Sequence, residues 1–311
     1  MFTKILVGVD GQQGGRDAIA LAAQLADDDA KTWLIHVFGA GLMPGRGAAL
    51  LLSIDLEQSR RLLEREREAL APAAEPVLCA DRSIGHALHV LAERHDADLI
   101  VTGASRHGFL GRVLLGDDTI AALNGAPCAV AVAPFGYADR PHPLSVLGVG
   151  YDGSPESERA LAAARALAAR WRSPIRALSV ISLQSVPYGE PAAENWPDAA
   201  KQLMGDRRNE LRQLADVEGD VTYGDPSEEL LAFGEQVDLL IVGSRGYGPV
   251  GRLMHGSTTN QLARRARCPV LVPPRSLPRQ RHHDWDLPFE VPLSEADDST
   301  DQVSTSPWSR A

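Results

Sequence analysis

The sequence predicts an α/β fold made of two tandem, doubly wound domains, each with a five-stranded parallel sheet. Two observations predict it. Three segments of the first half recur in the second half at a nearly constant interval, and short aliphatic runs alternate with longer segments of helical periodicity. The length of 311 residues is large for one compact core and ordinary for two. The aliphatic runs are continuous, which fits strands covered by helices on both faces.

The repeat is carried by three pairs of strand-like segments. They are 5–11 with 146–153, 97–103 with 237–243, and 128–132 with 268–272. The first pair, aligned on its Asp-Gly dipeptide, lies 142 residues apart and the other two lie 140 apart, so one small gap aligns the copies. We therefore expect one domain over 1–138 and a second over 144–276. A linker near 136–143, which holds two prolines and a glycine, joins them.

In the second copy, three short motifs predict where helices begin. Ser154 is placed to cap a helix whose first residue is Pro155. Asp225-Pro226 opens another helix, and Gly256-Ser257-Thr258 opens a third. The five strands expected between the helices cover roughly 144–150, 174–181, 218–223, 237–242 and 268–273.

Beyond the second domain the pattern stops. Residues 277–311 hold four prolines and seven acidic side chains against three arginines, a net charge of −4, so disorder is expected. An apolar patch from Trp285 to Val291 leaves open that this tail docks on a domain or a partner. The signs that alternate over 60–68 predict a solvated, ion-paired helix face.

Composition limits the function. The net charge is −10 without a cluster of basic residues, which disfavours nucleic-acid binding. No apolar run approaches the ~20 residues of a membrane helix, and the N-terminus resembles a strand rather than a signal peptide. Three cysteines without CxxC spacing indicate buried thiols rather than disulfides or zinc ligands. We expect a cytoplasmic protein that binds no membrane.

The sharpest motif is a glycine-rich loop after the strand that ends at Val242. It runs Gly243-Ser-Arg-Gly246-Tyr-Gly248, and after seven further residues reaches Gly256-Ser257-Thr258 at the start of a helix. Glycines let backbone amides approach a polyphosphate, and a helix N-terminus adds partial positive charge. Arg252, and less readily Arg245, is placed to neutralise phosphate. The alternative is a glycine-rich turn without a ligand.

This spacing resembles the ATP-binding branch of the universal stress protein family, and the resemblance covers about residues 1–275. It implies an adenine nucleotide alpha-hydrolase-like fold that binds ATP, with Mg²⁺ as the expected companion, in stress adaptation or growth control. It also implies that the two domains pack through their closing strands, because 269–273 matches the strand through which domains of that family pair. In that family the aspartate at the end of strand one, here Asp152, contacts the nucleoside, although it is also suited to cap the next helix. The implied site comprises Gly150, Asp152, Val180, Gly243, Gly246, Gly248, Gly256, Ser257 and Thr258.

The first copy departs from the pattern. Its weaker candidates are Gly8, Asp10, Val37, Gly103 and Gly116. Arg106 replaces the second glycine, while Asp117 and Asp118 replace the Ser-Thr pair, and a carboxylate beside phosphate weakens binding. We expect weak or no ATP binding there. The alternatives are that an aspartate holds Mg²⁺, or that Arg106 reaches a phosphate.

Other nucleotide and hydrolase motifs fail. Residues 148–153 spell the dinucleotide fingerprint, but its first glycines fall inside a strand. No GxxxxGK[ST] or GxSxG occurs. An enzyme that hydrolyses ATP or transfers adenylyl groups stays an alternative, with only His255, Asp152 and Arg252 as candidate groups, so we name no catalytic residue and no protein metal ligand. A nucleotide-free assembly scaffold is the third hypothesis, and a homo-oligomer is compatible with all three.

Overall fold

The computed structural model describes residues 2–38, 48–81, 83–104, 122–182, 196–214, 216–244, 257–274 and 289–291. Its strands are β1 Phe2–Gly8, β2 Ala26–Phe38, β3 Glu75–Ala80, β4 Leu99–Gly103, β5 Ala129–Ala133, β6 Leu147–Gly150, β7 Ile175–Ile181, β8 Val217–Tyr223, β9 Leu239–Val242, β10 Val270–Val272 and β11 Phe289–Val291. Its helices are α1 Gln13–Leu25, α2 Ala48–Leu70, α3 Ile84–Arg94, α5 Pro155–Trp171, α6 Trp196–Gln213, α7 Pro226–Gly234 and α8 Ser257–Arg265, with a 3₁₀ turn, η1, at Tyr137–Asp139.

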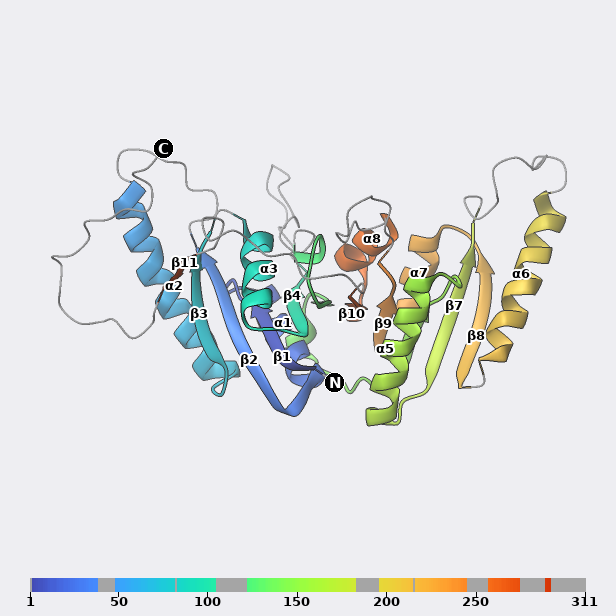
Figure 1. Ribbon diagram of the computed structural model, residues 1–311, viewed down its shortest axis with the longest axis horizontal. Helices are drawn as coiled ribbons and strands as arrows, with labels where there is room; N and C mark the ends of the chain where they lie inside the picture. Colours follow the sequence, from blue (N-terminus) through green and yellow to red (C-terminus); the bar gives the residue numbers. More distant parts are fainter. Residues whose placement is uncertain are drawn as a thin grey trace.

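All these strands belong to one sheet, in the order β11-β3-β2-β1-β4-β5-β10-β9-β6-β7-β8 (Figure 1). The first domain contributes β3-β2-β1-β4-β5 and the second β8-β7-β6-β9-β10, and every pair within each set is parallel. The order turns back beside β1 and β6, which is the doubly wound arrangement with its switch point at the first strand. The predicted fold class is confirmed, as two sets of five parallel strands in one continuous sheet.

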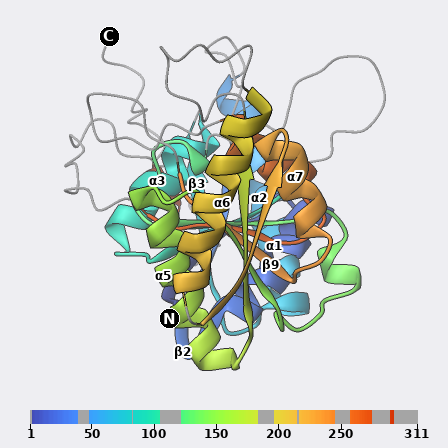
Figure 2. The ribbon, with the colours of Figure 1, turned by 90° about the vertical axis from the view of Figure 1, so that its right-hand side faces the viewer.

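Helices cover both faces of the sheet because strand residues alternate between two apolar cores. Ile5 and Val7 belong to the core that also holds residues of α1, α2, α5 and α6, whereas Leu6 belongs to the core that holds residues of α3, α7 and α8. Figure 2 looks at the second domain end-on, with α5 and α7 on opposite sides of the strands. The continuous aliphatic runs are therefore buried on both faces, as their composition predicts.

The two domains join through their closing strands. β5 and β10 pair antiparallel, with Val132 opposite Val270 and Val130 opposite Val272. The connecting turn is also held: the Asp17 carboxylate of α1, completely buried, accepts hydrogen bonds from the Gly136 and Ala138 amides at 2.8 and 2.7 Å. The expected pairing of the closing strands is confirmed, and a buried carboxylate fixes the linker beside it.

The duplication extends to polar contacts. Asp98, just before β4, accepts hydrogen bonds from the backbone amides of Thr3 and Lys4. Asp238, just before β9, does the same for the start of the second domain, at 2.9 and 2.8 Å from the amides of Ser145 and Val146. Each aspartate ties the first strand of its domain to the fourth, so the same device was retained in both copies.

The predicted helix starts of the second domain are confirmed. The Ser154 hydroxyl accepts a hydrogen bond from the Ser157 amide at 3.2 Å, and Pro155 is the first residue of α5. Asp225 accepts bonds from Ser227 and Glu228 at the start of α7. Helix α8 begins at Ser257. No helix among the described residues is both long and apolar enough to cross a membrane.

Only residues 289–291 of the tail are described, and they form β11, antiparallel to β3 at the outer edge of the first domain (Figure 1). Disorder is therefore wrong for these three residues, and docking on a domain, the alternative for the tail, holds for them. The sequence pattern could not show that these residues pair with β3, because β3 lies more than 200 positions away in the chain.

Candidate functional site

A pocket opens in the second domain at the carboxyl ends of β6, β7 and β9, where α5, α7 and α8 begin. The pocket is open to solvent, and about 610 Å³ of free space lies within and in front of it. Its lining consists of Gly150, Tyr151, Asp152, Ser154, Glu156, Ser157, Leu178, Val180, Pro226, Leu230, Val242, Gly243, Thr258 and Thr259. This is the switch point of the sheet, the position at which doubly wound folds hold their ligands.

The pocket brings together five of the predicted residues. Gly150, Asp152, Val180, Gly243 and Thr258 all line it. Ser257 is the exposed first residue of α8, beside Thr258. The remaining three predictions, Gly246, Gly248 and Gly256, lie outside the described residues, as do Arg245, Arg252 and His255. The residues before and after the loop thus converge on one pocket, while the loop itself stays a prediction.

The inner wall of the pocket is apolar. Leu178, Leu230 and Val242 are buried there and line the pocket together with Gly150. A methyl group added to Gly150 would lie 3.2 Å from Val242 and 3.3 Å from Leu230, so a larger residue would press on this wall. Sequence reasoning named Gly150 and missed Leu230, whose signal was the helix that opens at Asp225-Pro226.

The outer wall is polar. The Asp152 carboxylate accepts a hydrogen bond from the Ser154 amide at 3.0 Å, around a turn in which Gly153 has φ of +75°. Glu156 forms an ion pair with Arg159 at 2.8 Å. A carboxylate that already faces a guanidinium repels an anion less than an unpaired one would. The sequence prediction missed Glu156, because a glutamate early in a helix is an ordinary helix-start residue.

Two contacts hold the walls in place. The Thr259 hydroxyl donates to the Gly243 carbonyl at 3.4 Å, joining α8 to the end of β9. The Tyr151 hydroxyl donates to the Glu158 carboxylate, and burial, followed by this hydrogen bond, raises the pKa of Tyr151 to about 12. Tyr151 therefore stays protonated and fixes the strand end that carries Asp152.

Packing alone requires a glycine at position 243. A methyl group there would lie 2.7 Å from the Glu156 backbone carbon, because α5 crosses directly over the end of β9. The same holds in the first domain, where a methyl group on Gly103 would lie 2.0 Å from the Gly14 carbonyl oxygen. Close approach of helix and strand thus explains both glycines whether or not a phosphate binds.

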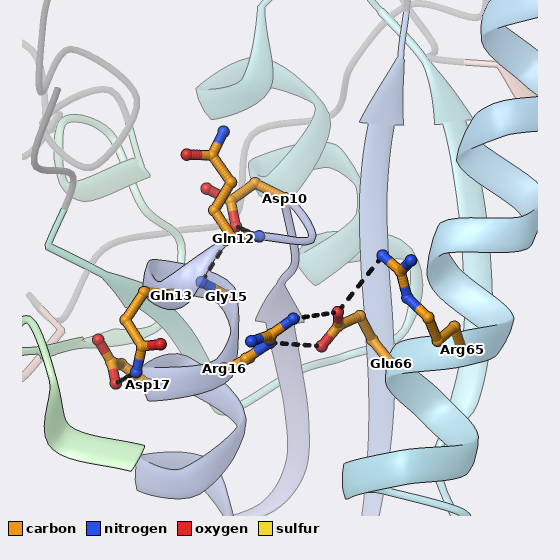
Figure 3. Close-up of polar contacts among 8 residues, drawn as sticks. All are labelled: Asp10, Gln12, Gln13, Gly15, Arg16, Asp17, Arg65 and Glu66. Atoms are coloured by element: carbon orange, nitrogen blue, oxygen red, sulfur yellow. Dashed lines mark hydrogen bonds and ion pairs between the residues drawn. The ribbon is translucent and has the colours of Figure 1, made fainter. Parts of the chain in front are cut away.

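The first domain uses its equivalent residues differently (Figure 3). Gly8, Asp10 and Gly103 occupy the corresponding strand ends, and Val37 lies on β2 as Val180 does on β7. Asp10 accepts hydrogen bonds from the amides of Gln12 at 2.9 Å and Gly15 at 3.1 Å. Its carboxylate therefore caps the first turn of α1. Gly116 and the loop around it lie outside the described residues.

One expectation about the first domain is wrong in part. The helix face over 60–68 was predicted to be solvated, yet Glu66 is only 3% exposed. Its carboxylate is bound by Arg16 of α1 at 3.3 and 3.4 Å and lies 3.8 Å from Arg65 (Figure 3). The alternating charges predicted ion pairs along one helix. The structure instead uses Glu66 to join two helices across 50 residues of sequence.

Comparison with known proteins identifies the fold's family. The profile of the universal stress protein family matches residues 1–134 and again 145–274. The chain belongs to the universal stress protein family. A universal stress protein from Mycolicibacterium smegmatis is 30% identical over 86% of this chain and 96% of its own length. A universal stress protein from Mycobacterium tuberculosis is 28% identical over 88% of this chain and 97% of its own length.

Among solved structures, a universal stress protein from Archaeoglobus fulgidus superimposes with a TM-score of 0.59 at 17% identity, covering 88% of this chain and 99% of that one. At this identity the likeness concerns the fold alone. These relatives thus align with this chain over more than nine tenths of their own length, 96%, 97% and 99%.

Proposed function

We propose that this universal stress protein binds one ATP, with Mg²⁺, in the pocket of its second domain and acts as a regulatory module in stress adaptation or growth control. The observation that carries the proposal is convergence. The ends of three strands and the starts of three helices meet at one pocket whose inner wall is apolar and whose outer wall is polar. An apolar wall suits the flat base of a nucleotide, and a polar wall suits its sugar and phosphates.

The described residues suggest how the nucleotide lies. The base fits between the side chains of Val180 and Leu230, and Asp152 is placed to accept bonds from the ribose hydroxyls. The triphosphate then runs toward the first turn of α8, where Thr258 lines the pocket and the helix N-terminus favours negative charge. Mg²⁺ ordinarily keeps several waters and takes its other ligands from phosphates and one or two carboxylates.

Regulation requires that occupied and empty states differ in their contacts. Helix α8 is the element in position to respond, because it borders the pocket through Thr258 and precedes β10, the strand that joins the domains. The three free, buried thiols agree with the expected cytoplasmic location, which stays a prediction. We assign no catalytic residue.

The proposal is tested by calorimetric titration of the full chain with ATP-Mg²⁺. We expect one site per chain. The double variant Gly246→Arg/Ser257→Asp carries the residues of the first copy into the second, and we expect binding to be lost. The matched control makes the reverse exchange, Arg106→Gly/Asp117→Ser. It should leave ATP binding in the second domain unchanged and strengthen ATP binding in the first domain. Unchanged affinity in Gly246→Arg/Ser257→Asp would refute the site.

A steady-state assay of ATP turnover separates a binding module from an enzyme. We expect no turnover above a slow background. Turnover that disappears in Gly256→Glu, with folding retained by circular dichroism, would favour the ATPase alternative. Absence of both binding and a thermal shift with ATP-Mg²⁺ would favour a scaffold.

A further inference from the structure

The strand at the outer edge of the first domain is covered by the chain's own tail. β11 pairs antiparallel with β3, placing Phe289 opposite Ala80, Glu290 opposite Cys79 and Val291 opposite Leu78. The Glu290 carboxylate forms an ion pair with Arg94 at the end of α3 and lies 4.0 Å from the His95 ring. The tail is thus held by backbone pairing and by one ion pair from the covering helix.

The described part of this cover is short. β3 extends from Glu75 to Ala80, and the described residues of the tail pair with Leu78 to Ala80. The Arg94 and Glu290 side chains are each about one third exposed, at 36% and 33%. An ion pair this open to solvent contributes little on its own. As far as the tail is described, β11 adds three paired residues and one such ion pair, and its release leaves the pairing of β3 with β2 in place.

The two outer edges of the sheet differ in how they are protected. β8, at the opposite end, carries the exposed charges Glu218 and Asp220 on either side of Gly219. Charges and short, interrupted edges are what natural sheets use to prevent pairing with another chain. β3 has its charge and its proline at its start, Glu75 and Pro76, and neither a charge nor a proline lies in Leu78–Ala80. That last part of the β3 edge is the part that β11 covers.

We propose that the β3 edge is a self-association surface, that β11 covers it within the chain, and that a second copy of this chain pairs with β3 when β11 leaves. The fold itself argues for this partner. β5 and β10 are equivalent strands of two copies of one domain, and they pair antiparallel at the centre of the sheet. Antiparallel pairing of two β3 strands gives a two-fold symmetric contact of the same kind.

The test reverses one charge in the full chain. Glu290→Arg places like charges at Arg94 and is expected to accelerate hydrogen exchange of the β11 amides about tenfold. Light scattering should then show the mass rising with protein concentration from one chain, 33.4 kDa, toward two. The double variant Arg94→Glu/Glu290→Arg restores the ion pair and should restore slow exchange and the single-chain mass. Glu295→Arg, with the same change of charge in the tail, is the control.

Two results would overturn the proposal. If the β11 amides of the natural chain already exchange as fast as those of Glu290→Arg, at the rate of unprotected amides, the tail does not cover the edge in solution. If Glu290→Arg releases β11 while the mass stays that of one chain at every concentration, a second copy is not the partner of this surface. A rise in mass that the double variant fails to reverse would also count against the assigned ion pair.

Discussion

The two domains share a strand order and an Asp-Gly turn, yet the aspartate of that turn makes different hydrogen bonds in each. In the first domain Asp10 caps α1 through the Gly15 amide. In the second domain the equivalent amide, that of Ser157, bonds instead to the Ser154 hydroxyl. Serine takes over the cap here, while the Asp152 carboxylate lines the pocket and accepts a hydrogen bond from the Ser154 amide. The proposed site therefore predicts that helix capping and nucleotide binding depend on different residues in this domain.

The surroundings of the turn differ in the same direction. Leu62 of α2 packs against Gly11 in the first domain, where a methyl group on that glycine would lie 2.4 Å away. In the second domain the guanidinium of Arg207 occupies this place beside Gly153. The first domain therefore surrounds its turn with an aliphatic side chain and the Arg16–Glu66 pair, whereas the second keeps polar groups near the pocket. These differences favour nucleotide binding in the second domain.

The largest effect is expected from Gly103→Ala and Gly243→Ala. Each added methyl group overlaps the backbone at the start of α1 or α5, and overpacking of this kind costs about 2–3 kcal/mol of stability. Denaturant unfolding followed by circular dichroism should show similar losses for the two variants. Only Gly243→Ala should also weaken ATP binding. Equal loss of ATP from Gly103→Ala would mean that the domains do not differ as described.

A smaller effect is expected from Arg16→Met. Removing the guanidinium leaves the buried Glu66 carboxylate with Arg65 alone, at 3.8 Å, and we expect a loss of about 2 kcal/mol because a buried charge loses its main partner. ATP affinity should not change, since the pair lies in the first domain. Glu66→Gln combined with Arg16→Met should recover much of the loss, and no recovery would show that the charge is not what makes the single variant unstable.

The smallest and most selective effect is expected from the turn aspartates. Asp10→Ala removes a helix cap and should cost about 1 kcal/mol, with ATP binding unchanged. Asp152→Ala should cost less stability, because Ser154 retains the cap, and should lower ATP affinity in a titration. Ser154→Ala provides the matched test of the cap, with a loss of about 1 kcal/mol. A reversed pattern, with stability lost in Asp152→Ala and affinity unchanged, would remove Asp152 from the site.

Local patterns in the sequence predicted what depends on neighbouring residues. The Ser154-Pro155 start of α5, the Asp225 cap of α7 and the strand runs of the second domain all follow from short-range chemistry, and the family resemblance added the pairing of β5 with β10. Asp152 and Val180 line one pocket because strand ends in a parallel sheet meet at one edge, and their role in binding stays a prediction.

Contacts between distant segments escaped prediction. The acidic run at the start of β2 gives one example: Asp28 lies 3.4 Å from Arg170 at the end of α5, joining the two domains, and no local signal pairs these positions. Buried Glu66 and the β3–β11 pairing are of the same kind. Their partners are set by the packing of whole elements, which alternating charge or a short apolar patch cannot specify.

The antiparallel joint between β5 and β10 has a consequence for how such proteins diverge. When identical chains associate, every substitution appears on both sides of the symmetry axis, so a change that helps one side also burdens the other. Here both sides are encoded separately, at a fixed one-to-one ratio, and the joint does not depend on protein concentration. Asp10 and Asp152 were therefore able to acquire different partners while β5 and β10 stayed paired. One domain can change its function while the other keeps the joint between them.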